Sequence, residues 1–125
     1  MAGFIGESNL LRGTIAAAAD GTLRAVTMGG TEFVVARGAG TAEGATVLLI
    51  RPESLRLGID QPGGRHAVRG TVEEIVYLGG IRKYTIRINA HETLVVRPPN
   101  QAGARELGIA SRVRVEWEPQ DLRVL

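Results

Sequence analysis

Apolar and polar residues alternate in short stretches along most of the chain, and turns rich in glycine separate these stretches. An alternation with a period of two is typical of strands that bury one face. Helix signals are scarce, so the sequence predicts an all-β fold. The predicted strands form two series, at 10–17, 22–28, 32–37, 45–52 and 55–57, and at 67–78, 82–88, 93–97, 112–118 and 122–125.

Three short motifs of the first series return in the second series in the same order. "RGTI" at 12–15 returns as "RGTV" at 69–72, and "TEFVV" at 31–35 resembles "ETLVV" at 92–96. The third pair is "IRPESLRL" at 50–57 and "WEPQDLRV" at 117–124. Ordered matches indicate an internal duplication. The chain therefore divides into a first unit at 1–59, a linker at 60–66 and a second unit at 67–125.

Each unit has five predicted strands and is too small to bury a robust core alone. A five-stranded, partly open antiparallel barrel is the OB architecture. We therefore expect an OB-fold-like protein of two small duplicated antiparallel β-barrels, packed as one intertwined domain. Pro52 and Pro119 cannot donate to a strand ladder, so they should mark strand ends. Arg51 and Glu53 could pair across the first of these corners.

Pairs of residues that end in glycine mark the turns between predicted strands. A two-residue hairpin turn needs positive φ, which glycine adopts readily. The pairs Asp20-Gly21, Gly29-Gly30 and Gly79-Gly80 stand at such positions, and a hairpin explains the last pair without a ligand.

Four longer stretches carry a family resemblance: "GFIGESNLLRGTI" from Gly3, "LLIRPESLRL" from Leu48, "GTVEEIVYLGGIRKYTIRI" from Gly70 and "VRVEWEPQDLRVL" from Val113. Together they resemble the TOBE domain, the transport-associated OB domain at the C-terminal end of ATP-binding subunits of bacterial ABC importers. The similarity is to the branch that serves polyamines, iron(III) and phosphonates.

The resemblance implies a regulatory and dimerisation domain that supports ATP-driven solute uptake. Its implied partners are the ABC ATPase domain, a second copy of the subunit in a homodimer and, indirectly, the membrane permease subunits. The implied location is cytoplasmic, peripheral to the inner face of the membrane through the transporter complex. Phe4 and Ile5 lie where the chain would join the ATPase domain, so they are candidates for that interface.

No G-x-x-x-x-G-K-[ST] phosphate loop occurs in the sequence. We therefore expect no catalytic residue, no enzyme activity and no cofactor in this chain, while ATP and Mg²⁺ would belong to an ATPase domain outside it. Both an excised regulatory domain and a natural stand-alone protein fit this pattern.

The start of the chain also resembles small oxyanion-binding members of the same superfamily. In those proteins a Ser/Asn-containing segment precedes an L-x-G-x-[IV] strand, as Ser8 and Asn9 precede "LRGTI" here. Such donors could hold an oxyanion or the transported solute. Alternatively, Ser8 or Asn9 caps a short turn. The candidate ligand-binding residues are Glu7, Ser8, Asn9, Arg12, Arg51 and Glu53.

Composition narrows the remaining classes of function. The 15 basic residues nearly balance the 13 acidic ones, for a net charge of +2, and like charges form no block, which disfavours a nucleic-acid binder. The absence of cysteine excludes thiolate metal sites and a cysteine nucleophile. His66 and His91 fit no common metal spacing, so no metal site is expected.

Overall fold

The computed structural model describes residues 8–19, 21–35, 43–59, 66–98 and 107–125. These residues form ten strands, two short 3₁₀ turns and no α-helix, which confirms the all-β prediction. The first five strands are β1 (Asn9–Ala17), β2 (Leu23–Thr27), β3 (Glu32–Val35), β4 (Gly44–Ile50) and β5 (Arg56–Ile59). The second five are β6 (Ala67–Leu78), β7 (Ile81–Arg87), β8 (Thr93–Val96), β9 (Arg112–Glu116) and β10 (Arg123–Val124).

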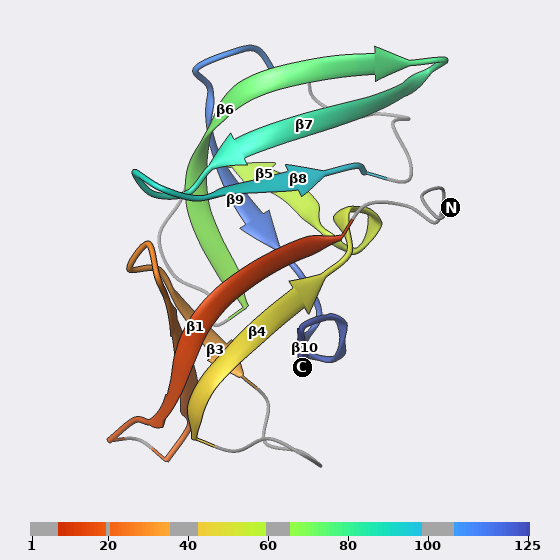
Figure 1. The fold of residues 1–125 in the computed structure, drawn as a ribbon. Helices are drawn as coiled ribbons and strands as arrows, with labels where there is room; N and C mark the ends of the chain where they lie inside the picture. Colours follow the sequence, from red (N-terminus) through yellow and green to blue (C-terminus); the bar gives the residue numbers. More distant parts are fainter. Residues whose placement is uncertain (1–7, 20, 36–42, 60–65, 99–106) are drawn as a thin grey trace.

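The strands build two antiparallel five-stranded sheets that exchange their last strands. The first sheet has the order β10-β4-β1-β2-β3, and the second has the order β5-β9-β6-β7-β8. In Figure 1, β5 lies among the strands of the second sheet and the dark blue β10 lies beside β4. The two orders become identical when β1 is matched with β6 and each later strand with its counterpart, as expected for a duplication.

The exchange means that neither sheet follows the predicted boundary between the two units. β5 belongs to the first unit but pairs with β9, and β10 belongs to the second unit but pairs with β4. The linker at 60–66 stays a prediction, because residues 60–65 lie outside the described residues.

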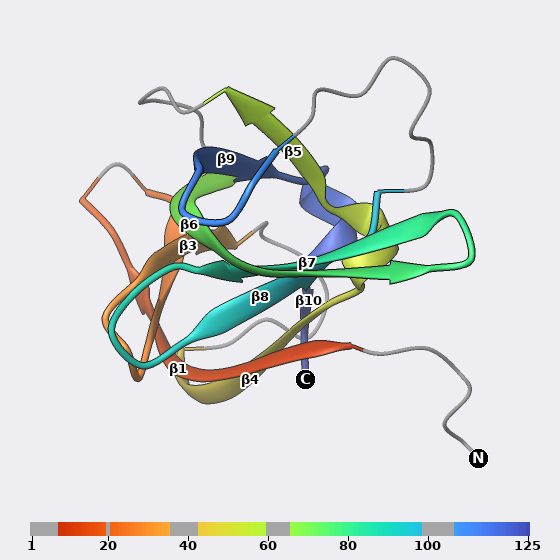
Figure 2. The same cartoon turned by 90° about the horizontal axis from the view of Figure 1, so that it is seen from above.

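One core lies between the two sheets, which Figure 2 shows from above. The inward side chains of both repeats form a single cluster, including Ile15 and Leu48 from the first sheet and Ile86 and Val115 from the second. Phe33 of β3 stacks on Trp117, which follows β9, with 5.4 Å between the ring centroids. The core is therefore shared, and neither repeat buries it alone.

The glycine pairs build two different turns. Gly79 and Gly80 both have positive φ, at 58° and 93°, and they join Leu78 to its paired residue Ile81 as predicted. In the other pair only Gly30 has positive φ, at 97°. That turn is longer than predicted, because the Thr27 N–H donates to the Thr31 carbonyl across it.

Each predicted proline corner is a 3₁₀ turn, at Pro52–Ser54 and at Pro119–Asp121. The first corner is fastened to the other repeat, because the Arg97 N–H donates to the Pro52 carbonyl at 3.0 Å. The expected partner of Glu53 was wrong: its carboxylate pairs with Arg97 at 3.4 Å rather than with Arg51. Arg97 follows β8, so tertiary contact outweighs the nearer neighbour in sequence.

Candidate functional site

The structure brings some of the predicted ligand-binding residues together. Asn9 pairs with Ile50, the residue before Arg51, and bonds to Val95, while Glu53 pairs with Arg97 close by, so they lie at one end of the first sheet. The predicted ligand residue Glu7 and the predicted interface residues Phe4 and Ile5 lie outside the described residues. Arg12 is exposed in the middle of β1, while Arg51 and Glu53 are exposed at the first proline corner. Ser8 is exposed just before β1.

Asn9 has a structural partner instead of a turn to cap. It is buried, with 7% of its surface exposed. Its side-chain amide donates to the Val95 carbonyl at 2.9 Å, and its side-chain oxygen accepts from the Val95 N–H at 2.8 Å. The Asn9 side chain thus imitates the backbone of a neighbouring strand along β8, and it joins the first repeat to the second.

The outward side of the first sheet carries a hollow and several exposed apolar side chains. We call it the first outer face. It consists of Leu10, Arg12, Thr14, Ala16, Arg24, Val26, Met28, Glu32, Val34, Ala45, Val47, Leu49, Arg123 and Leu125. An open hollow of about 830 Å³ lies on it, lined by residues of β1, β2 and β4 and by Leu125. Met28 is 80% exposed, Leu125 68% and Leu10 57%. Exposed large apolar side chains gathered on one face are typical of an interaction site.

The second outer face is built on the same pattern but is charged. It consists of Arg69, Thr71, Glu73, Arg87, Arg112, Arg114 and Glu116. The pairing registers match its residues to the first outer face, with Arg69 for Arg12 and Thr71 for Thr14. The other matches are Arg87 for Val26, Asn89 for Met28, Arg112 for Ala45, Arg114 for Val47 and Glu116 for Leu49.

The two repeats therefore give an internal comparison. At the five positions just matched, the second repeat carries charged or polar side chains where the first carries apolar ones. The reverse holds nearby, where the first repeat carries Arg24 and Glu32 and the second carries Thr85 and Thr93. The two sheets have the same strand order, so their outward surfaces differ in side chains alone.

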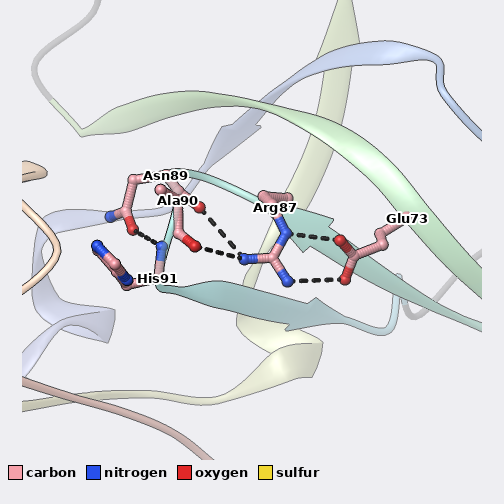
Figure 3. Close-up of polar contacts among 5 residues, drawn as sticks. All are labelled: Glu73, Arg87, Asn89, Ala90 and His91. Atoms are coloured by element: carbon pink, nitrogen blue, oxygen red, sulfur yellow. Dashed lines mark hydrogen bonds and ion pairs between the residues drawn. The ribbon is translucent and has the colours of Figure 1, made fainter.

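An ion pair organises the second outer face. Arg87 Nε donates to one oxygen of Glu73 at 2.5 Å and Nη2 donates to the other at 3.1 Å, while Nη1 donates to the carbonyls of Asn89 and Ala90 (Figure 3). The hydrogen bonds from Arg87 lower the pKa of Glu73, and the charge of Arg87 adds to this effect. In return, the hydrogen bond to Glu73 raises the pKa of Arg87.

We expect the Glu73 side chain to titrate below 4.5, the ordinary value for a glutamate. A carboxylate whose pKa is lowered by folding stabilises the fold above its unfolded-state pKa, and this contribution is lost as pH falls through the lowered folded-state value. NMR titration of the Glu73 carboxyl carbon measures the shift. In Arg87→Gln the midpoint should return toward 4.5, whereas Arg112→Gln, on the same face, should leave it unchanged.

A polar cluster joins the two repeats where the β2–β3 turn meets the β7–β8 turn. Glu92 accepts hydrogen bonds from Thr27 at 2.5 Å and from Asn89 at 2.8 Å, and Asn89 also donates to Thr31 at 2.7 Å. A Cβ at Gly29 would lie 2.6 Å from both Asn89 Nδ2 and Glu92 Oε1, so glycine leaves room for this cluster. Its polar groups satisfy one another, which indicates a structural role.

Within the described residues, no three His, Cys, Asp or Glu side chains gather as a metal ion would require. No helix in the same ranges has the length and apolarity to cross a membrane.

Comparison with known proteins places the chain in a family. The family model described as "TOBE domain" matches residues 48–125, which include the end of β4 and all of β5 to β10. The whole chain is 38% identical to the spermidine/putrescine import ATP-binding protein PotA of Thermobifida fusca and 34% identical to that of Rubrobacter xylanophilus. It spans about a third of the length of these relatives, since it covers 33% of each.

A structural comparison agrees on the fold. A structure of the cytoplasmic molybdate-binding protein ModG with molybdate bound superposes with a TM-score of 0.74, over 93% of this chain and 94% of ModG. The sequence identity is 17%, so the likeness concerns the fold. The OB-like architecture and the family resemblance drawn from the sequence are both confirmed: the chain belongs to the TOBE domain family.

Proposed function

We propose that the chain is the C-terminal regulatory and dimerisation domain of an ABC importer ATP-binding subunit. The observation that carries the proposal is the match of the whole chain to one third of such subunits, combined with the absence of a phosphate-binding loop from the sequence. The domain would support transport without catalysing a reaction. ATP and Mg²⁺ would bind the ATPase domain of the same subunit.

The relatives named for spermidine and putrescine import support a parent subunit that serves polyamine uptake. In such a complex the domain would lie at the cytoplasmic face of the membrane and contact the permease only through the ATPase domains. A dimerisation role needs a surface able to bind a second copy, and the first outer face is a suitable surface.

Two measurements on the purified chain test this proposal. Calorimetric titration with Mg-ATP should give no binding signal. Sedimentation equilibrium should show a reversible dimer, with a dimer fraction that rises with protein concentration. Saturable ATP binding, or a chain that stays monomeric at about 1 mM, the weak limit of specific association, would contradict it.

A second candidate is the binding of an oxyanion or of the transported solute. ModG, which shares the fold, is named for molybdate binding, and Arg12 and Thr14 are among the residues that line the hollow of the first outer face. A ligand at ~100 times its Kd stabilises a protein by ~2.7 kcal/mol, which a thermal-shift screen detects. Molybdate, sulfate and spermidine are the ligands to screen, and Arg12→Ala should abolish a shift caused by an oxyanion.

A further inference from the structure

We infer that Arg51 and Arg123, at one end of the first outer face, bind a carboxylate side chain in an acidic and apolar segment of another protein. The inference assigns a binding site that the proposed function does not contain. It starts from a difference between the two repeats at one pair of equivalent positions.

In the second repeat, these equivalent positions form an ion pair. The repeated proline corners match Arg56 with Arg123 and Glu118 with Arg51. Arg56 of β5 lies opposite Glu116 of β9, and Glu118 follows two residues later. Arg56 Nη2 is 3.1 Å from Glu118 Oε2. At this corner the chain therefore supplies a carboxylate to its own guanidinium group.

The first repeat carries two arginines at the same positions. Arg123 of β10 lies opposite Leu49 of β4, and Arg51 follows Leu49 by two residues with an extended backbone, at φ −82° and ψ 142°. Side chains two residues apart on an extended segment point to the same face. Arg51 and Arg123 are both exposed on the outward side of the first sheet. The geometry that joins opposite charges in the second repeat thus brings like charges together in the first.

The two arginines have no carboxylate of their own. Their guanidinium groups form no ion pair or hydrogen bond with any of the residues that the structure describes. Glu53, two residues from Arg51, is paired with Arg97 at 3.4 Å. Paired guanidinium groups bind a carboxylate through charge-assisted hydrogen bonds. The second repeat therefore shows which group the first repeat lacks, and an external carboxylate is suited to take that place.

The surroundings favour a protein segment over a small free anion. Leu10 lies opposite Leu49 and is 57% exposed, and Leu125 follows Arg123 by two residues and is 68% exposed. A bound segment can cover these leucines with its own apolar side chains while its carboxylate contacts the arginines. A small anion would leave them in water.

Other polyanions fit this surface less well. The first outer face as defined above contains no aromatic residue, so it offers no platform on which nucleic-acid bases stack. Recognition of an anionic membrane typically needs clusters of about 4–8 basic residues. Here two arginines form the site, and the same face carries the acidic Glu32.

NMR titration with a short peptide in which glutamate alternates with leucine tests the site. The Nε–Hε signals of Arg51 and Arg123 should shift, while the signal of Arg56 should stay in place. Exposed charge pairs each contribute little in water, so we expect a Kd of about 0.1 mM at low salt and weaker binding as salt is added. The same peptide with lysine in place of glutamate should not bind.

The second repeat supplies the decisive variant. Arg51→Glu introduces the residue found at its equivalent position and provides the missing carboxylate from within the chain. It should raise the Kd of the peptide about tenfold or more. Arg24→Glu makes the same change of charge on the same face but at the other end of β1, opposite Ala16. Because salt screens charges at that range, it should leave the Kd within about twofold.

The reciprocal exchange tests the same idea by gain of binding. Glu118→Arg builds a pair of arginines at the second corner. It should create a second site, detected as a shift of the Arg56 Nε–Hε signal that the wild type does not show. Circular dichroism verifies the fold of each variant.

Several outcomes would overturn the inference. One is equal weakening by Arg51→Glu and Arg24→Glu, which would indicate general charge attraction. Another is tighter binding of phosphatidylglycerol vesicles or of oligothymidylate than of the peptide. A third is an equal response of both arginines to acetate, which would indicate a small-anion site. If Glu7→Gln strengthens peptide binding about threefold or more, the carboxylate comes from this chain.

The remaining outcomes separate the inference from the proposed function. If Arg51→Glu abolishes the dimer, the carboxylate belongs to a second copy, and the inference fails while dimerisation stands. If the wild-type chain does not bind the peptide at about 1 mM, the inference fails alone. Mg-ATP binding or a strictly monomeric wild type would contradict the proposed function without touching the peptide result.

Discussion

Replacing Gly70 by alanine should lower the free energy of unfolding by about 3 kcal/mol, the upper end of the range for overpacked core positions. A Cβ at Gly70 would lie 2.6 Å from Ile86 Cγ2 and 2.7 Å from the Arg87 carbonyl oxygen on the neighbouring strand. The carbonyl belongs to the strand pairing, so β7 would have to move away from β6. For a chain of this size the loss corresponds to a fall in Tm of about 10 °C.

Gly13 occupies the equivalent position of the first repeat and should behave similarly. Its Cβ would lie 2.6 Å from the Val26 carbonyl oxygen. Gly58→Ala is the control, because a Cβ there would meet its nearest atom, Glu116 Oε2, at 3.7 Å. That variant should stay within about 0.5 kcal/mol of the wild type in urea unfolding. Equal effects of the three substitutions would show that steric exclusion is not the cause.

Asn9→Asp should destabilise the protein by about 3 kcal/mol at pH 7. The new carboxylate can still accept from the Val95 N–H, but it cannot donate to the Val95 carbonyl, 2.9 Å from the present amide nitrogen. Two oxygens would then face each other at a buried position. The expected cost combines a lost hydrogen bond, an unsatisfied carbonyl and a buried negative charge.

The pH dependence identifies this mechanism. Burial raises the pKa of the new carboxyl group in the folded state, and its protonated form can donate to the Val95 carbonyl. The variant should therefore recover stability relative to the wild type as pH falls toward 4. Ser8→Asp adds the same charge at the exposed neighbour and should have little effect at either pH. A cost for Asn9→Asp that does not change with pH would exclude the proposed role of the carboxyl group.

The sequence predicted every strand of the described residues, because alternation and ordered repeats are local signals that survive in one chain. The resemblance of four longer stretches to TOBE domains indicated the family. The sequence did not predict the exchange of β5 and β10. Each is a short strand after a proline corner, and the local pattern is equally compatible with pairing in either sheet. Asn9 was singled out for a ligand or a cap, since a single asparagine carries no sign of which backbone it will contact.

The contrast between the outer faces was present in the sequence but could not be interpreted there. Aligning the repeats sets Val26 against Arg87 and Val47 against Arg114. Only the pairing registers show that these positions face outward together and form one surface. The Glu53–Arg97 pair was missed for a related reason, because its members are far apart in sequence and meet only through the shared core.

The exchanged last strands also bear on how a gene of this kind can change. A half-gene encoding only the first repeat would supply β5, which closes the other repeat's sheet, and would lack β10, which closes its own. Recombination that replaced one half with that of a distant relative would separate pairing strands that had changed together. We therefore expect the two repeats to be inherited as one unit, free to diverge on their outward faces but not at the strand pairings that join them.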